Sequence, residues 1–177
     1  MANVYFISDL HLGHSNILKF GQRSFDSIEE HDDALVQSWN SVVRPNDLVW
    51  VLGDVAMDVQ ALDRAMSRMV GRKRLILGNH DTFDTQVYLK YFERVSAFEK
   101  RYHGLVMTHI PIHPQEMQWR NWKTNVHGHI HNGLIDLADE QYINVNVDIV
   151  GMIPVSLDQL RERIEWKTRV CRSTRYN

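Results

Sequence analysis

The stretch RLILGNHD, residues 74–81, joins a short apolar run to a glycine and three polar residues. Basic residues precede the run and Gly78 ends it, a pattern typical of a strand that is covered on both faces. Open α/β sheets bind ligands just beyond the ends of such strands. Glycine allows close approach of the backbone, and Asn79, His80 and Asp81 all carry atoms that can bind a metal ion. This stretch therefore predicts a buried strand that delivers functional side chains at its carboxyl end.

Two earlier stretches follow the same pattern. Residues 4–8 are predicted to form a strand that ends in Asp9 and His11, two positions whose side chains can lie on one side of the backbone. Residues 47–52 are a second apolar run, and Asp54 follows it after one glycine. Helical patterns separate these strands. The alternation of short strands and helices predicts right-handed crossovers and a largely parallel sheet with helices outside.

The first two long helices carry start signals. A capping box over residues 27–30 begins one helix, whose apolar residues include Leu35 and Trp39. Asp58 is predicted to cap the next helix. Its expected apolar face is made of Val59, Leu62, Met66 and Met69. A short helix is expected over residues 84–92.

After Phe92 the pattern changes. Residues 95–98 and 105–107 are predicted to pair as a hairpin across His103-Gly104. Residues 110–124 are expected to form an ordered loop over the site, because long loops of this kind are usually functional. A last strand is expected over 142–147, and a second capping box, 156–159, should open a C-terminal helix. The two groups of strands predict two sheets packed face to face in one domain spanning 1–177.

Composition limits the classes of function. A chain of 177 residues with 44% hydrophobic content suits one well-filled core. The formal charge of −2 gives no general attraction to nucleic acid or to an anionic membrane. The single cysteine, Cys171, excludes an internal disulfide and a thiolate-rich zinc cluster. No run approaches the ~18–20 apolar residues of a membrane span, and no export signal is evident. We expect a cytoplasmic protein; nothing indicates its oligomeric state.

The predicted strand ends carry a set of nitrogen and oxygen ligands without sulfur: Asp9, His11, Asp54, Asn79, His80, His109, His129 and His131. One divalent ion could take Asp9, His11, Asp54 and His131, and a second ion Asp54, Asn79, His109 and His129. Asp54 would then bridge two ions ~3.5–4 Å apart, the separation at which a pair of metals can activate a shared hydroxide and clamp a phosphoryl group. Taken singly, each motif is better explained by a cap or an Asx-turn. Together they would require coincidence at five successive strand ends.

These motifs, in this order, resemble the five blocks of the calcineurin-like metallophosphoesterases: Asp9-x-His11, Gly53-Asp54, Gly78-Asn79-His80-Asp81, Thr108-His109 and Gly128-His129-x-His131. Residues 144–148 and 154–157 look like the small bacterial and phage members of that family. The resemblance implies a four-layer α/β/β/α sandwich of two mixed sheets and the division of ligands given above. It also implies that His80 is not a ligand but helps to position the phosphate and donates a proton to the leaving oxygen.

The expected function is a dinuclear metal-dependent phosphoesterase acting on a small or nucleotide-like phosphodiester, by attack of a hydroxide shared by the two ions. Carboxylate and imidazole ligands suit Mn²⁺, with Fe, Zn or Ni as alternatives. The chain lacks the Asp-Arg-Gly ending of the Ser/Thr protein phosphatases after Asp54 and has Asp81 where they have Glu, which disfavours a phosphoprotein substrate. The alternatives are a phosphomonoesterase, a nuclease, for which nucleic acid would be the partner, and a non-catalytic protein-binding scaffold.

Several other side chains have two interpretations. His14, Asn16 and His113 are candidate substrate contacts, although surface or helix-start roles explain them as well. His127 alternates with His129 and should pack on the opposite side. His31 and His103 are expected to face solvent. Three aromatic residues could stack on a base, with packing slightly preferred: Trp119, Trp122 and Tyr142.

Overall fold

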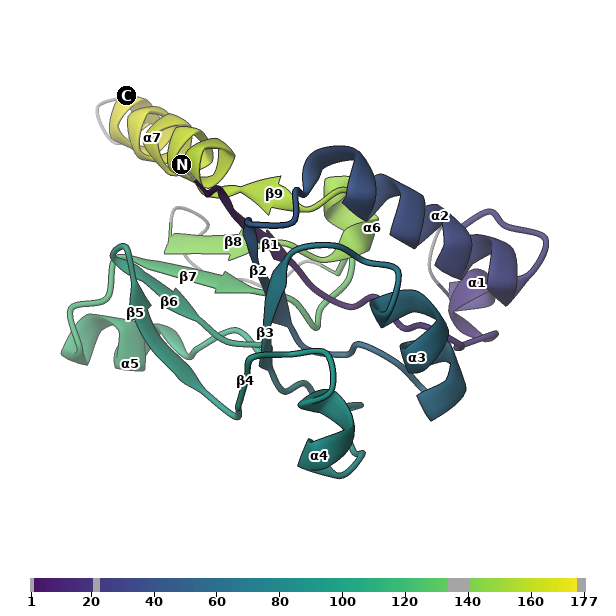
Figure 1. The fold of residues 1–177 in the computed structure, drawn as a ribbon. Helices are drawn as coiled ribbons and strands as arrows, with labels where there is room; N and C mark the ends of the chain where they lie inside the picture. Colours follow the sequence, from purple (N-terminus) through teal and green to yellow (C-terminus); the bar gives the residue numbers. More distant parts are fainter. Residues whose placement is uncertain (1, 21–22, 134–140, 175–177) are drawn as a thin grey trace.

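Two β-sheets form the centre of the molecule in a computed structural model, which describes residues 2–20, 23–133 and 141–174 (Figure 1). The first sheet has the strand order β4-β3-β2-β1-β9. Its strands are β1 (Val4–Ile7), β2 (Leu48–Leu52), β3 (Arg72–Ile76), β4 (Arg94–Ser96) and β9 (Val155–Ser156). Strands β1 to β4 pair in parallel, and β9 is antiparallel to β1. The predicted parallel sheet is therefore present, with an antiparallel strand at one edge.

The second sheet has the order β5-β6-β7-β8. Its strands are β5 (Glu99–Tyr102), β6 (Leu105–Met107), β7 (Thr124–His127) and β8 (Tyr142–Asn144). Strand β5 is antiparallel to β6, whereas β6, β7 and β8 run parallel. Both sheets are thus mixed, as expected.

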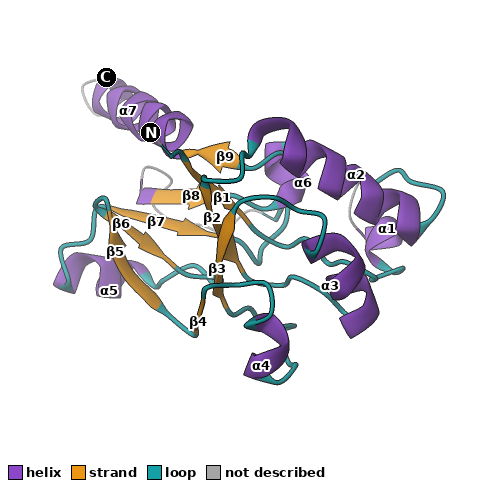
Figure 2. Cartoon of the chain, viewed as in Figure 1, coloured by secondary structure: helices purple, strands orange, loops and turns teal. Residues whose placement is uncertain are grey.

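Helices flank the two sheets (Figure 2). They are α1 (Ile17–Phe20), α2 (Ile28–Val42), α3 (Val59–Met66), α4 (Thr85–Tyr88), α5 (Pro114–Trp119), α6 (Val147–Val150) and α7 (Leu157–Thr174). The predicted caps are confirmed: Ser27 Oγ accepts from the Glu30 N–H at 3.1 Å, and Asp58 Oδ1 from the Ala61 N–H at 2.8 Å. No helix in the described part of the chain is long and apolar enough to cross a membrane.

Successive side chains on the central strands face two different apolar layers. Val49 and Val51 of β2 join an apolar cluster with Leu35 and Trp39 of α2, beneath the helices. The neighbours of these valines on β2 point the other way, where Trp50 joins a second cluster between the two sheets. A smaller cluster joins the second sheet to α5. The result is the predicted α/β/β/α sandwich.

Some local predictions were wrong. The hairpin across His103-Gly104 pairs β5, residues 99–102, with β6, whereas residues 94–96 form β4 and join the first sheet. Residues 110–124 contain helix α5 and the start of β7. The last strand stops at Asn144, and α6 follows it. Val59 is 44% exposed and does not belong to the buried face of α3.

Candidate metal centre

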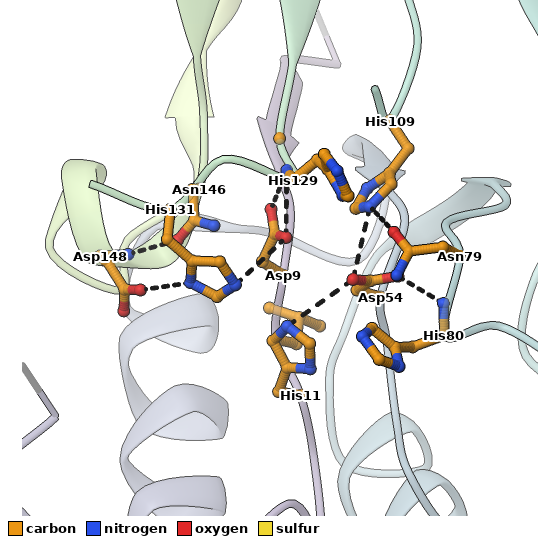
Figure 3. A network of polar contacts seen from close by, with 12 residues as sticks. Asp9, His11, Asp54, Asn79, His80, His109, His129, His131, Asn146 and Asp148 are labelled. Atoms are coloured by element: carbon orange, nitrogen blue, oxygen red, sulfur yellow. Dashed lines mark hydrogen bonds and ion pairs between the residues drawn. The ribbon is translucent and has the colours of Figure 1, made fainter. Parts of the chain in front are cut away.

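The predicted ligands meet at the carboxyl ends of strands from both sheets (Figure 3). The first sheet supplies Asp9 and His11 after β1, Asp54 after β2, and Asn79 after β3. The second sheet supplies His109 after β6 and His129 and His131 after β7. Because parallel strands end at one edge of a sheet, residues separated by more than a hundred positions converge here.

The backbone at these positions is unusual. Eight non-glycine residues in the described part of the chain have positive φ, and five of them are candidate ligands: Asp9, His11, Asp54, His129 and His131. Left-handed backbone costs a side-chain-bearing residue about 1–2 kcal/mol and persists where the surroundings impose it. Here the turns are tied together, since the N–H groups of Asp9 and His11 donate to the Gly53 and Asp54 carbonyls at 3.0 Å each. Strained backbone that is held in this way is typical of functional sites.

Asp9, His11 and His131 make up what we call the first metal group. Asp9 is buried and accepts from the His129 N–H at 3.1 Å, and its Oδ1 lies 4.0 Å from His131 Nε2. Burial lowers the pKa of His11 to about 3, so its imidazole is neutral, the form that binds a metal. Neither ring nitrogen of His11 has a hydrogen-bond partner in the structure. A buried imidazole whose nitrogens have no hydrogen-bond partner fits a metal ligand.

Asp54, His109 and His129 make up the second metal group, and Asn79 lies beside it. His109 Nδ1 donates to the Leu52 carbonyl at 2.8 Å, which leaves Nε2 facing Asn79 Oδ1 at 3.0 Å and Asp54 Oδ2 at 3.4 Å. Burial opposes a charge on His109, yet its pKa is raised because the carboxylates of Asp54 and Asp9 favour the cation. The oxygens of Asn79 and Asp54 thus lie around His109 Nε2 and favour positive charge at this point.

Asp54 connects the two groups. Its Oδ2 lies 3.7 Å from His11 Nε2 and 3.4 Å from His109 Nε2, while Oδ1 accepts from the His80 N–H at 2.9 Å. Burial alone would raise the pKa of Asp54, but hydrogen bonds from His109 and His80 hold it below its usual value. The carboxylate, amide and imidazole donors, with both His11 nitrogens lacking a hydrogen-bond partner, fit a pair of divalent ions that share Asp54.

The other predicted contacts differ in position. The exposed His80 has its ring 5.5 Å from that of His11, and His14 has its ring 5.4 Å from His11. Asn16 is exposed, and His113 caps α5 by accepting from the Gln115 N–H at 3.3 Å. His127 is buried and packs on Tyr142, as predicted, with ring centroids 6.0 Å apart.

A cavity of about 520 Å³ opens beside Asn79 and His109. Its apolar wall is formed by Leu77, Ala97, Phe98, Ile110, Pro111 and Ile112. None of the described residues that line it carries an acidic or basic side chain apart from His109. Tyr142 does not face the cavity as a stacking platform; its hydroxyl donates to the Ile112 carbonyl at 2.7 Å and anchors the wall. The space next to the second metal group therefore suits an uncharged, apolar substituent.

Four residues near the centre have structural contacts that the sequence did not reveal; Arg23, His31 and Asp81 are buried, and Asp148 is partly buried. Asp81 fastens the turns after β2 and β3 together, and Asp148 receives a hydrogen bond from His131. Arg23 holds Asp148 and the turn after β1. His31, expected at the surface, is fully buried and contacts Arg23. Residues 78–81 and 144–148 were visible as motifs, whereas nothing local distinguished Arg23 or His31.

Comparison with known proteins places the chain among relatives of matching length. The model of the calcineurin-like phosphoesterase family matches residues 2–162. An uncharacterized protein of Methanocaldococcus jannaschii is 32% identical over 181 residues, which cover 98% of this chain and 97% of that protein. The gene 66 protein of Mycobacterium phage L5 is 33% identical over 199 residues, which cover 93% of this chain and 95% of that protein. The crystal structure of a protein of unknown function from Aquifex aeolicus is similar with a TM-score of 0.78 at 25% identity, covering 93% of this chain and 100% of that one.

Proposed function

The chain belongs to the calcineurin-like phosphoesterase family, and from that premise we propose that it hydrolyses a small, nucleotide-like phosphodiester with two divalent ions. The observation that carries the proposal is the position of Asp54, whose Oδ2 lies within 3.7 Å of His11 Nε2 and 3.4 Å of His109 Nε2. The first group would hold one ion and the second group, with Asn79, the other. When bound, such ions supply Lewis-acid activation of the attacking water and of the phosphoryl group. The mixed donor set favours Mn²⁺.

His80 is the proposed proton donor. Its backbone N–H donates to Asp54 Oδ1 at 2.9 Å, while the residue is exposed and its ring lies 5.5 Å from the His11 ring. The alkoxide that leaves a phosphate ester needs a proton, and imidazole is the side chain suited to supply one near neutral pH. His80 therefore assists departure of the alcohol without holding an ion.

The apolar cavity favours a substrate that carries an organic group on its phosphate. A diester carries two such groups, and a substituent placed beside Asn79 and His109 would enter the cavity, where Phe98 is 49% exposed. A nucleoside or another flat, uncharged group matches the cavity's size and lining. A phosphate monoester would have one organic group fewer to bind. A diester is accordingly the preferred substrate class.

The first test is hydrolysis of bis-p-nitrophenyl phosphate by the Mn²⁺-loaded protein. We expect turnover in the wild type. In Asp54→Asn the rate should fall at least ~100-fold, because a neutral amide cannot bridge two cations as a carboxylate does. Asp158→Asn, a change of the same kind at an exposed carboxylate of α7, should retain the wild-type rate. Unaltered turnover in Asp54→Asn would exclude the bridge.

A panel of substrates separates the alternatives. A monoesterase would prefer p-nitrophenyl phosphate to its diester, and a nuclease would degrade single-stranded DNA faster than the small diester. A protein-binding scaffold would turn over none of them with Mn²⁺, Fe²⁺, Zn²⁺ or Ni²⁺. The proposal requires the small diesters to be the best substrates.

His80→Ala tests the proton donor. The rate with the diester should fall ~10²–10⁴-fold, the usual contribution of general acid catalysis. Metal content, measured by elemental analysis after desalting, should stay at the wild-type level because His80 holds no ion. Loss of metal in this variant would instead make His80 a ligand.

A further inference from the structure

Asp148 lies at the start of α6 and contacts a candidate ligand directly. Its Oδ2 is 2.7 Å from His131 Nδ1 (Figure 3). An ionised carboxylate only accepts hydrogen bonds, so His131 Nδ1 carries the proton. The neutral ring then keeps its lone pair on Nε2, which lies 4.0 Å from Asp9 Oδ1 in the first metal group. The contact thus selects the nitrogen that is free to bind an ion.

Arg23 holds Asp148 from the other side. Its Nε donates to Asp148 Oδ1 at 2.6 Å, and only 3% of the Arg23 side chain is exposed. The same guanidinium donates from Nη2 to the Asp9 carbonyl at 2.8 Å and from Nη1 to the Leu10 carbonyl at 3.0 Å. One buried cation therefore ties Asp148 to the left-handed turn that presents Asp9 and His11. The planar guanidinium has the donor geometry for such simultaneous contacts.

The contacts continue into α2. Arg23 Nη1 lies 3.1 Å from His31 Nε2, and because arginine only donates, Nε2 must accept and Nδ1 must carry the proton. His31 Nδ1 then donates to Asp32 Oδ1 at 2.9 Å, and Asp32 Oδ2 accepts from the Gly13 N–H at 3.0 Å. Arg23 is thus held by a buried histidine of α2 as well as by the turn.

We propose that Asp148, braced by Arg23, is the positioning residue that fixes the orientation and tautomer of His131 as a ligand of the first metal group. The inference rests on the proposed function, since it assigns His131 to a metal ion. The positioning role of Asp148 is confined to the first metal group, because in the second group His109 is oriented by the Leu52 carbonyl, at 2.8 Å. A change at Asp148 should therefore weaken the binding of the ion in the first metal group and leave the binding of the other ion unchanged. A residue that merely stabilised the fold would affect both.

Binding of Mn²⁺ to single-group backgrounds tests this selectivity by calorimetry. His129→Ala removes a ligand of the second group and reports on the first, and His11→Ala does the reverse. Adding Asp148→Asn to the His129→Ala background should weaken Mn²⁺ binding ~10–100-fold, the usual effect of losing such a supporting carboxylate. The same substitution in the His11→Ala background should change affinity less than about twofold. Equal weakening in both backgrounds, or none in the first, would overturn the proposal.

A measurement without metal separates this inference from the proposed function. In ¹⁵N-labelled wild-type protein at pH 9, the long-range NMR correlations of His131 should show the proton on Nδ1. In Asp148→Asn they should shift toward the Nε2–H form, and Arg23→Lys, which keeps the charge but not the planar donor set, should shift them part of the way. Asp158→Asn should leave them unchanged. If Asp148→Asn leaves the His131 tautomer unchanged, the positioning role is refuted. If the substitution shifts the tautomer but the wild-type protein binds no Mn²⁺, only the assignment of His131 to a metal ion is refuted.

Discussion

Asp81 offers no atom to either metal group, yet it holds the centre together. Its carboxylate is buried and accepts three backbone hydrogen bonds, from the N–H groups of Asp54 and Gly78 at 2.8 Å each and of Val55 at 2.9 Å. These donors belong to the turns after β2 and β3. One side chain therefore fixes Asp54, the proposed bridging carboxylate, relative to the turn that presents Asn79 and His80. In the sequence, Asp81 stood out as the end of the Gly78-Asn79-His80-Asp81 block and as a departure from the glutamate of the protein phosphatases, but not as a support for the turns.

Asp81→Asn should destabilise the metal-free protein by about 1–3 kcal/mol, because the amide nitrogen would face a buried N–H donor and leave it unsatisfied. Urea denaturation measures this difference. The exposed Asp33, which pairs with Arg68 at 2.6 Å on the surface, gives the matched control Asp33→Asn, for which a change under ~0.5 kcal/mol is expected. Equal stability of the Asp81 and Asp33 variants would show that the three hydrogen bonds do not brace the turns.

The turns at the strand ends are the elements that make the site. Strands β1, β2 and β7 each pass directly into left-handed residues that carry candidate ligands, and glycines allow the turns to approach one another. Gly128 is an example, since a Cβ there would collide with Asp9 Oδ2 and with the Ser8 side chain. Gly78 is another, because a Cβ there would collide with the Asp54 carboxylate. The glycines of the sequence blocks thus provide space for the adjoining ligands.

Gly128→Ala should displace Asp9 and weaken Mn²⁺ binding to the first metal group. Elemental analysis after desalting should find close to one ion in this variant and close to two in the wild type. Gly104→Ala provides the control: Gly104 has a positive φ, of 84°, but a Cβ there would meet nothing within 4 Å. That variant should keep both ions. Full metal content in Gly128→Ala would mean that the close approach of β7 and β1 is not needed for binding.

The candidate ligands at the strand ends could be predicted from the sequence, whereas the residues that hold these ligands in place could not. Asp9 and Asp54 each follow an apolar run, so local pattern was enough to place them. Arg23 and Asp148 are 125 residues apart, and only the folded chain brings them together. His31 stands among charged residues and looked exposed, although α2 turns it inward onto Arg23. The predicted hairpin strand over residues 95–98 was wrong: residues 94–96 join the first sheet and residues 99–102 pair with β6, and a local pattern does not show which sheet a strand meets.

At the scale of the whole molecule, the centre lies where the two sheets join. Phe6, Trp50 and Ile76 from the first sheet pack against Met107 and Val126 from the second in the apolar layer between them. This packing sets the ends of β1, β2 and β3 opposite those of β6 and β7. Neither sheet alone contains a complete metal group, since each group combines side chains that follow strands of both. The sandwich as a unit, rather than any one motif, is what forms the proposed dinuclear site.

Anomalous diffraction from crystals of the Mn²⁺-loaded protein tests that claim most directly. We expect two manganese peaks ~3.5–4 Å apart, one against Asp9, His11 and His131 and the other against Asn79, His109 and His129, with the Asp54 carboxylate between them. A single peak, or two peaks that do not share Asp54, would exclude a dinuclear centre bridged by this carboxylate.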